Sequence, residues 1–514
     1  MQGKKGCQAR TAEGLRRDRF TARFLVGILV VSGLSASGCA PRRALTVPDR
    51  EAQLRADIEA ILDNPAFSAG QWGVVIQSLR DGRYLLRRNP HKAFMPASNL
   101  KLFTTATALA KLGPEYRYVT RLYRTGPIVA GTLQGDLVIR GVGDPSITGR
   151  YHNGDPLAVF RSWVDSLRAL GVRRISGRVI GDDDWFEEEI LGAGWSWDYE
   201  SDWYAAQISA LSFNDNCVDI VYRPGARPGD PVAYELTPDT RYVQIDFRVA
   251  TVRRGLEREI VYQRKRASNF VRIDGALAAG GESVRDWFSV ENPTLYAAFV
   301  FRELLERSGI AVDGGAFDKD DLPGYAYVDT VVVARYVSPP MSELCKTVNK
   351  VSQNLYAELI LRTLGKHFRD VGSASQGIEV VKEFVSGLGI DPNQLVMVDG
   401  SGLSRYNYVT PQTVATLLRA MRRHPYGHYF YDSLPIAGVD GTLKRRMVGT
   451  AAEGNVRAKT GYIENVRALS GYVTTLDGEE LVFSLIVNHY LAPTSVANDA
   501  QDLICQRLAS FSSR

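Results

Sequence analysis

Three short polar motifs, far apart in the chain, contain residue types that together could perform acyl transfer on a serine. They are Ser98-Asn99-Leu100-Lys101, Ser352-Gln353-Asn354 and Lys459-Thr460-Gly461. On a helix, a lysine three residues after a serine lies on the same face, one turn away, so its amine can reach the hydroxyl. Such an amine can take the serine proton if burial keeps part of it neutral. The first motif therefore predicts a nucleophile, Ser98, with its own base, Lys101.

The residues around Ser98 favour a buried helix. Pro96 precedes the serine, and apolar residues follow at helical spacing: Leu100, Leu102, Phe103, Ala106, Leu109 and Ala110. Ser98 would then lie at the helix start, where free N–H groups and the helix dipole favour developing negative charge. In isolation, the motif would be better explained by Ser98 as a helix N-cap and Lys101 as a solvated first-turn residue. The other two motifs outweigh that interpretation.

The second motif stands just before an apolar helical run that extends to Leu364. A turn or helix-end loop there could point both of its polar side chains the same way. The hydroxyl of Ser352 could relay a proton to a departing amine, and the carboxamide of Asn354 could hold both a lysine and a substrate amide. Taken alone, the motif would be a helix N-cap.

The third motif precedes a β-rich stretch from Val466 to Val473, which places it on a strand whose edge could bind an extended peptide. Gly461 would leave room for a ligand to approach the backbone. Lys459 and Thr460 would supply a positive charge and a hydroxyl for a terminal carboxylate. An exposed lysine at the start of a strand is the commoner fate of such a tripeptide.

Together the motifs resemble those of the penicillin-recognising serine DD-peptidases. Within them, the chain resembles the three-domain D-alanyl-D-alanine carboxypeptidase/endopeptidases, the class C low-molecular-mass penicillin-binding proteins. The resemblance is nearly continuous from about Glu51 to the C-terminus. It includes four further segments: Gly143-Asp144-Pro145-Ser146, Ala210 to Asn216, Asp399 to Arg405 and Leu434 to Leu443.

The resemblance implies an α+β fold. A β-lactamase/DD-peptidase-like catalytic domain, with an antiparallel sheet flanked by helices, would carry a large inserted, mainly β region that forms two nested smaller domains. The stretch between Ser98 and Ser352 is long enough for such an insertion, and 514 residues agree with about three domains. The expected parts are residues 49–120 and 336–514 for the catalytic domain and 121–335 for the insertion, with the nested domain at roughly 225–285.

The sequence also predicts several helices. Within the insertion we expect one helix, from Leu157 to Leu170, among many strands and turns. After Pro340, helical patterns return, and the first runs from Glu343 to Leu364.

By resemblance, Ser98 is the acylated nucleophile and Lys101 its general base. Ser352 would relay the proton to the leaving group, and Asn354 would orient Lys101 and the substrate amide. The family's oxyanion hole consists of two backbone N–H groups, here those of Ser98 and Tyr462.

The resemblance gives the third motif a role in substrate binding. Lys459 would maintain the electrostatics around the second motif, and Thr460 would bind the terminal carboxylate. The residue after Lys-Thr-Gly is often Ser or Thr in this superfamily, but here it is Tyr462. The backbone N–H of Tyr462 can still serve the oxyanion hole, but the change removes a second hydroxyl for the carboxylate. Carboxylate recognition would therefore depend more on Thr460, or on an arginine that the sequence does not identify.

An acidic run, Asp182-Asp183-Asp184, precedes Trp185 and Phe186 in the insertion. In the resembling family, an Asp near such a motif helps to bind the amino-acid side chain of the peptidoglycan stem. Asp182 is the best-aligned candidate for that role. Ordinarily, three Asp residues before aromatic residues form a turn.

The N-terminus predicts an export signal. A basic segment ends at Arg23, an apolar run from Phe24 to Leu34 is too short to span a bilayer, and small residues follow up to Cys39. Ser35-Ala36-Ser37-Gly38-Cys39 resembles a bacterial lipoprotein cleavage site, in which Cys39 is acylated. We expect residues 1–39 to be a signal peptide of this type and 40–48 a linker. The mature protein would then be periplasmic or in the cell envelope, anchored to a membrane by lipid.

Other catalytic patterns are missing from the sequence. It contains no Cys-x-x-Cys, no His-Glu-x-x-His and no Gly-x-Ser-x-Gly, and its 6 histidines are scattered. A Ser-His-Asp hydrolase is therefore a weaker model, and we expect neither a metal nor a cofactor. Beyond Cys39 only Cys217, Cys345 and Cys505 remain, and three thiols cannot all pair.

The charge of the chain does not favour a nucleic-acid partner, because a net charge of +5 on 514 residues is mild. A basic cluster lies between Arg253 and Arg266, with Tyr262 among the basic residues. Exposed strands of an inserted domain explain it at least as well, and binding to an anionic wall or membrane surface is a third interpretation. The oligomeric state stays open.

The expected function is hydrolysis of D-Ala-D-Ala ends, or of D-Ala to diamino-acid cross-links, in peptidoglycan stem peptides through an acyl-Ser98 intermediate. β-Lactams would acylate the same serine. Two alternatives are a β-lactamase or esterase on the same fold, and a catalytically idle wall-binding lipoprotein. The long insertion disfavours the first, and the three intact motifs disfavour the second.

Overall fold

The computed structural model describes residues 46–328 and 330–513. Cys39 and the predicted signal peptide lie outside these residues, so the expectations of export and lipidation concern a part of the chain that is not described. Among the described residues, no helix has both the length and the apolar composition needed to cross a bilayer.

The first and last parts of the described chain form one domain, the main domain, around a five-stranded antiparallel sheet. Its strand order is β2-β1-β22-β21-β20. The pairing of β1 with β22 joins the two parts of the chain, from Gln71 opposite Asn488 to Ser78 opposite Leu481. The strands are β1 (Gln71–Ser78), β2 (Tyr84–Arg88), β20 (Arg457–Ile463), β21 (Val466–Thr474) and β22 (Glu480–Asn488).

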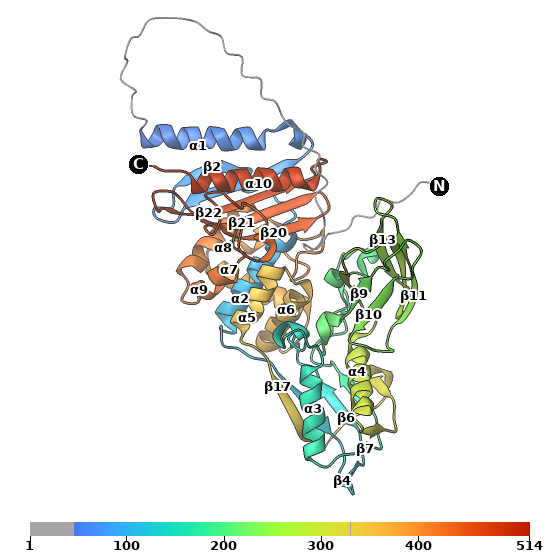
Figure 1. Cartoon of the computed structure of the whole chain (residues 1–514). Coiled ribbons are helices and arrows are strands. Elements are labelled where there is room, and N and C mark those ends of the chain that lie inside the picture. Colours follow the sequence, from blue (N-terminus) through green and yellow to red (C-terminus); the bar gives the residue numbers. More distant parts are fainter. Residues whose placement is uncertain (1–45, 329, 514) are drawn as a thin grey trace, which may run out of the picture.

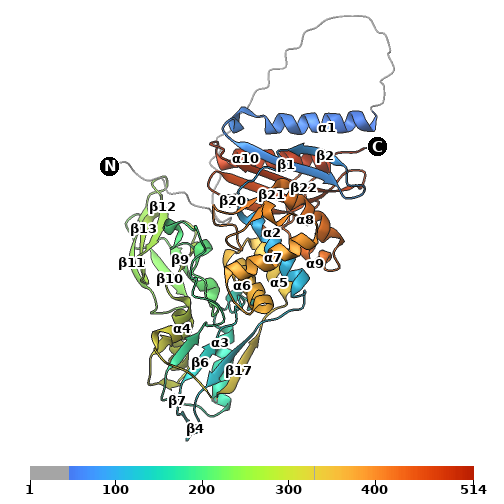
Figure 2. The same ribbon diagram turned by 180° about the vertical axis from the view of Figure 1, so that it is seen from behind.

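Helices cover both faces of this sheet (Figures 1 and 2), which explains why β22 is an almost continuous apolar run rather than an alternating one. On one face, α1 and α10 bury residues such as Ile58 and Ile504. A larger helical layer packs on the other face and contains the buried helix α2. The helices are α1 (Val47–Leu62), α2 (Lys101–Lys111), α5 (Met341–Lys346), α6 (Asn354–Arg369), α7 (Ala374–Gly387), α8 (Pro411–Arg423), α9 (Gly427–Ser433) and α10 (Thr494–Ala509).

The insertion leaves the main domain after α2 and returns before α5. Its first part contains a five-stranded sheet in the order β16-β8-β6-β3-β17 and a four-stranded sheet in the order β15-β7-β5-β4. The strands are β3 (Val119–Arg124), β4 (Ile128–Val129), β5 (Thr132–Leu133), β6 (Leu137–Arg140), β7 (Arg174–Ile175), β8 (Val179–Asp182), β15 (Ala311–Val312), β16 (Ala316–Asp318) and β17 (Val331–Val337).

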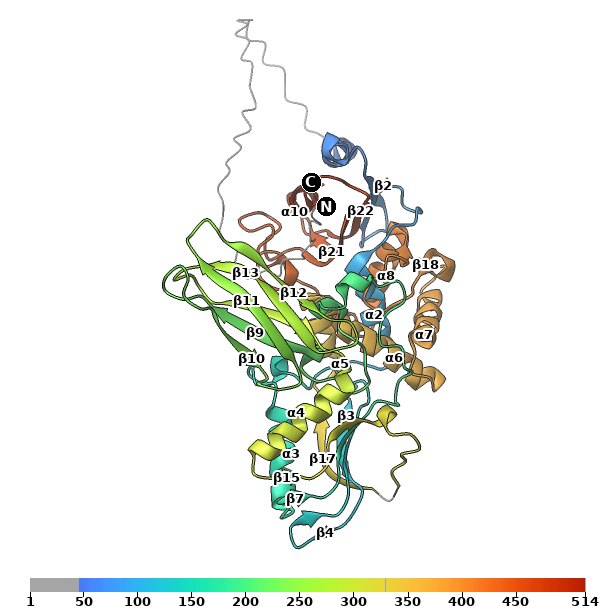
Figure 3. The ribbon, with the colours of Figure 1, turned by 90° about the vertical axis from the view of Figure 1, so that its right-hand side faces the viewer.

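Two three-stranded sheets are nested within this part and lie beside the main domain (Figure 3). Their orders are β10-β9-β14 and β11-β13-β12, and together they span Cys217 to Ser289, a wider range than the 225–285 expected. The strands are β9 (Cys217–Arg223), β10 (Ala233–Thr237), β11 (Gln244–Val252), β12 (Arg258–Arg264), β13 (Phe270–Ala278) and β14 (Val284–Ser289).

Among its described residues, the insertion contains two long helices, not the one expected. Helix α3 (Ala158–Ala169) matches the prediction, whereas α4 (Pro293–Arg307) was not predicted. The side chain of Asn292 caps α4 by accepting a hydrogen bond of 2.8 Å from the backbone N–H of Leu295. Helix α4 packs against β8 and β16 as well as α3, so it is buried on several sides and lacks the one-sided apolar period of a surface helix.

The basic cluster of the insertion is only partly exposed. Arg264 is buried and forms an ion pair of 2.5 Å with Glu291, and Arg266 forms one of 2.7 Å with Glu200. The expectation that exposed strands explain this cluster is therefore wrong for Arg264, because its guanidinium pairs with Glu291 inside the protein.

Candidate active site

Ser98 lies in a 3₁₀ turn, Ala97–Leu100, that runs directly into α2. No side chain caps this start, and the residues of α2 from Lys101 to Leu109 are all buried. The structure therefore excludes the simpler interpretation, in which Ser98 is an N-cap and Lys101 is solvated.

The amine of Lys101 has three neighbours in hydrogen-bond range. Its Nζ lies 2.8 Å from Ser98 Oγ, 2.5 Å from Asn354 Oδ1 and 2.6 Å from the backbone oxygen of Ser401. The two carbonyl oxygens can only accept, so they take two N–H groups of the amine. In a neutral amine the remaining position is the lone pair, and it then faces the hydroxyl of Ser98. The amine is thus oriented to accept the serine proton.

Burial lowers the pKa of Lys101 to about 7, although the charges of Asp399 and Glu358 oppose that shift. Desolvation penalises the ammonium form, so a substantial fraction of the amine is neutral near pH 7. Burial of Lys101 in the core therefore provides the neutral amine that a base requires.

The carbonyl group of Ser401 is held by buried carboxylates. Glu358 accepts the backbone N–H groups of Gly400 and Ser401, over 3.0 and 2.8 Å. Asp399 accepts those of Gly402 and Ser404, each over 2.8 Å. Burial raises the pKa of Glu358. These contacts give the Asp399 to Arg405 segment its role, because they aim one carbonyl oxygen at Lys101.

The second motif lies at a break in the predicted helix. The expected helix from 343 to 364 is divided into α5 and α6 by a π-helical turn, Thr347–Val351. Ser352 then adopts a left-handed conformation with φ of 67°, and Gln353 caps α6 by accepting the N–H of Leu355 over 3.1 Å. The break turns the side chains of Ser352 and Asn354 toward the first and third motifs.

Lys459 is buried and donates a hydrogen bond of 2.8 Å to the hydroxyl of Ser352. It also donates to the backbone oxygen of Thr460 over 2.9 Å. Burial lowers the pKa of Lys459 well below its usual value, and the nearby charge of Lys101 lowers it further. A charged Lys101 therefore disfavours the ammonium form of Lys459.

The Ser98 turn is joined directly to β20. The side chain of Asn99 donates to the backbone oxygen of Lys459 over 2.9 Å. A Cβ atom at Gly461 would lie 2.7 Å from the backbone oxygen of Pro96. The expectation that Gly461 makes room for a ligand is thus corrected, because the space is filled by the protein's own Ser98 turn.

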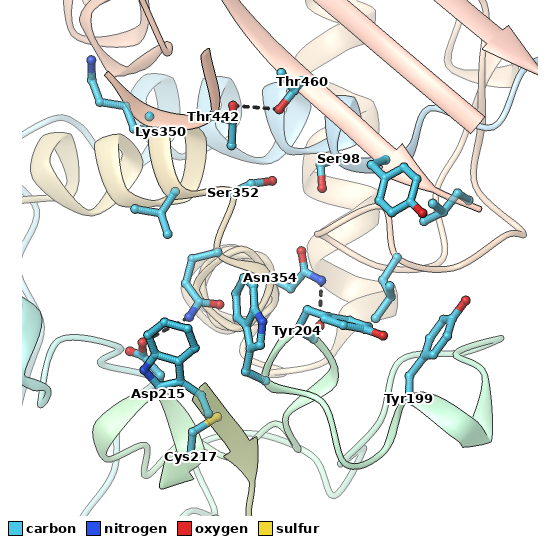
Figure 4. A pocket seen from close by; sticks show the side chains of 18 of the residues that line it. Ser98, Tyr199, Tyr204, Asp215, Cys217, Lys350, Ser352, Asn354, Thr442 and Thr460 are labelled. Carbon is cyan, nitrogen blue, oxygen red and sulfur yellow. Dashed lines mark hydrogen bonds between the residues drawn. The ribbon is translucent and has the colours of Figure 1, made fainter. Parts of the chain in front are cut away.

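The three motifs open onto one cleft of about 1110 Å³. Ser98, Ser352, Asn354, Thr460 and Tyr462 line it. Figure 4 shows that Ser98, Ser352 and Asn354 face this space together. The insertion supplies the opposite wall, with Tyr199, Trp203, Tyr204, Asp215 and Cys217 among its residues.

The insertion also reaches the second motif. The backbone oxygen of Tyr204 accepts a hydrogen bond of 2.7 Å from Asn354 Nδ2. Because Tyr204 takes the donor end of the carboxamide, the oxygen end points to Lys101. No sequence pattern signals this contact, since any residue could provide the backbone oxygen.

Asp182 does not belong to the site. It ends β8, is buried, and accepts hydrogen bonds from the Tyr327 hydroxyl and, over 3.1 Å, from the backbone N–H of Asp184. It is not among the residues that line the cleft. The acidic run is therefore the turn after a strand, and the structure removes Asp182 from the predicted substrate-binding residues.

These contacts place a serine hydroxyl against a buried lysine amine, the arrangement that serine acyl transfer without a histidine requires. The model of the D-Ala-D-Ala carboxypeptidase 3 (S13) family matches residues 54–511, so the chain belongs to that family. The DD-peptidase resemblance found in the sequence is thereby confirmed.

Two curated relatives have corresponding names. The D-alanyl-D-alanine carboxypeptidase of Actinomadura sp. (strain R39) is 36% identical over 490 residues, which cover 92% of this chain and 88% of the relative. The D-alanyl-D-alanine carboxypeptidase DacB of Haemophilus influenzae is 26% identical over 425 residues, or 81% of this chain and 85% of the relative.

A solved structure has the same fold. The crystal structure of penicillin binding protein 4 from Haemophilus influenzae aligns with a TM-score of 0.75 at 24% identity, covering 89% of this chain and 99% of that one. Its complex with a β-lactam aligns with a TM-score of 0.70 at 23% identity. The predicted α+β fold with inserted, mainly β domains is confirmed.

Proposed function

We propose that the protein is a serine-type D-Ala-D-Ala carboxypeptidase and endopeptidase that acts on peptidoglycan stem peptides. The observation that carries this proposal is the position of the Lys101 amine between Ser98 and two carbonyl acceptors. Membership of the S13 family supports the substrate class.

The reaction begins with attack by Ser98 Oγ on the carbonyl carbon of the peptide bond that follows the penultimate D-Ala. Lys101 takes the serine proton as the new bond forms. The backbone N–H groups of Ser98 and Tyr462 stabilise the oxyanion. Loss of one such donor typically costs ~10²–10³ in rate.

The leaving amine needs a proton, and Ser352 supplies it. Lys459 Nζ holds that hydroxyl by a hydrogen bond of 2.8 Å. The proton that Lys101 took from Ser98 replaces the one that Ser352 gives up, so Lys101 is neutral again before the next step. Asn354 holds Lys101 in place and offers an amide to the substrate backbone. The carbon–nitrogen bond breaks, and an acyl-Ser98 ester remains.

The ester is hydrolysed by water, with Lys101 as the base, and Ser98 is restored. Thr460 binds the terminal carboxylate of the substrate. A β-lactam presents a strained amide and a carboxylate to the same groups, so it acylates Ser98 and inhibits the enzyme. A complex of the H. influenzae protein with a β-lactam agrees with this inference.

We also propose export and lipid anchoring through Cys39. The basic segment, the short apolar run and the small residues before Cys39 support this part of the proposal. The peptidoglycan substrate lies outside the cytoplasm, which agrees with an exported enzyme.

A direct test uses two substrates, a peptide ending in D-Ala-D-Ala and a cross-linked dimeric muropeptide. Chromatography of the products should show released D-Ala from the first and monomers from the second, and Ser98→Ala should abolish both. If neither substrate is cleaved while benzylpenicillin is hydrolysed with turnover, the protein is a β-lactamase instead.

A further inference from the structure

Thr442 presents a second aliphatic hydroxyl next to Thr460. The hydroxyl of Thr460 donates a hydrogen bond of 2.8 Å to that of Thr442. Both residues line the cleft that contains Ser98. Figure 4 shows the pair facing the same space as Ser98 and Ser352. The two hydroxyl groups thus form one polar site beside the nucleophile.

The position of Thr442 is fixed by its surroundings. It lies in a 3₁₀ turn, Gly441–Leu443, whose Leu443 is buried. Gly441 has φ of 55°, and a Cβ atom there would lie 2.7 Å from the backbone oxygen of Lys350. The amine of Lys350 is also paired with the carboxylate of Asp440. The turn is therefore held against the segment that carries the second motif.

The neighbouring side chains do not supply this hydroxyl. In Tyr462, which follows Lys-Thr-Gly, the hydroxyl stands at the far end of a ring rather than next to the backbone. The guanidinium of Arg467 lies over that ring, 4.2 Å from its centroid. Arg446, which also lines the cleft, forms an ion pair of 2.7 Å with Asp502. Arg446 is thus already paired with a carboxylate, whereas Arg467 has no ion pair among the described residues and lies against the ring of Tyr462.

We propose that Thr442 is a specificity-determining residue that binds the terminal carboxylate of the substrate together with Thr460. In the ligand-free protein, the hydroxyl of Thr460 donates its proton in a hydrogen bond to the hydroxyl of Thr442. A carboxylate can only accept, so on binding it receives one O–H from each threonine. Two hydrogen bonds to an anion replace one between neutral groups, and bonds to an ionised acceptor are the stronger kind. This inference rests on the proposed function of the same site.

The test compares a peptide ending in D-Ala-D-Ala with the same peptide amidated at its C-terminus. Thr442→Val keeps the shape of the side chain and removes the hydroxyl, whereas Thr442→Ser keeps the hydroxyl. Thr416→Val, in α8, is the matched control, because its hydroxyl bonds only within that helix, to Gln412. Thermal unfolding of each purified variant shows whether it folds like the wild type.

We expect Thr442→Val to lower kcat/KM for the free acid by about 10- to 100-fold, the loss that follows from removing one hydrogen bond to a charged group. Hydrolysis of the amide should change little, and Thr442→Ser and Thr416→Val should resemble the wild type. Acylation by benzylpenicillin should slow in Thr442→Val, while acylation by its methyl ester should not.

An equal loss on the acid and the amide, or no loss on either, would overturn the role of Thr442 while the wild-type hydrolysis still supports the proposed function. A wild-type protein that cleaves neither peptide would overturn both.

Discussion

The side-chain oxygen of Asn354 lies 2.5 Å from the amine of Lys101, although 253 positions separate the two residues. The other end of the same carboxamide donates to Tyr204, a residue of the insertion. An amide that donates at one end and accepts at the other can lie only one way round. The insertion therefore takes part in orienting the amine of Lys101, in addition to forming one wall of the cleft.

Acylation of Ser98 should depend on pH. Lys101 must be neutral to take the proton of Ser98, and its pKa is lowered to about 7 by burial. The rate of acylation should therefore be low in acid, rise as the pH passes through about 7, and level off above it. Stopped-flow measurement of acylation by a chromogenic cephalosporin would show this. A rate that falls over the same range would exclude Lys101 as the base.

Asn354→Asp should shift that profile. The change is nearly isosteric, but it places a carboxylate where an amide oxygen now faces the amine of Lys101. An opposite charge at such a distance raises the pKa of a lysine by ~1–3 units, because it favours the ammonium form. Acylation at neutral pH should slow, and its midpoint should move to higher pH. An unshifted midpoint would contradict the contact between these two side chains.

Glu358→Ala should be strongly destabilising. Glu358 is buried, forms an ion pair of 3.2 Å with the buried Arg362, and accepts the N–H groups of Gly400 and Ser401. Removing one partner of a buried pair typically costs ~3–5 kcal/mol in free energy of unfolding. Urea denaturation should show this loss. Glu379→Ala, on the exposed side of α7, is the control and should change stability by less than about 0.5 kcal/mol.

Gly461→Ala should impair acylation. The added methyl group would lie 2.7 Å from the backbone oxygen of Pro96, so β20 and the Ser98 turn would have to separate. Gly387→Ala is the control, since a Cβ atom there meets no atom within 4 Å. We expect acylation to slow by about tenfold or more in Gly461→Ala, because small displacements of reacting groups cost large factors in rate. Equal rates in both variants would show that this packing does not position Ser98.

The parts of the site that could be predicted from the sequence depend on local spacing. Ser98 and Lys101 share a helical face because they are three residues apart, and the β-rich stretch that follows Lys459 predicted a strand there. At Ser352 the sequence predicted no more than a turn or a helix-end loop. A left-handed residue after a π-helical turn has no strong local sequence pattern. These residues come together because the β1 and β22 pairing joins distant segments of the chain.

Other features had no such signal. The backbone oxygens of Ser401 and Tyr204 act through position rather than residue type, so no pattern marks them. Helix α4 is buried on several sides and lacks an amphipathic period. For Asp182, the residue type suggested substrate binding, and that prediction was wrong. Asp182 lies at the end of β8 and accepts a hydrogen bond from Tyr327 within the insertion.

Every role proposed for the other site residues depends on Ser98 being the acylated nucleophile. The most direct measurement is the mass of the intact protein after incubation with benzylpenicillin, for the wild type and for Ser98→Ala. We predict a long-lived adduct with the full mass of the drug on the wild type and none on the variant. An adduct on both proteins, or an unmodified wild type in the presence of intact drug, would show that Ser98 is not the acylated residue.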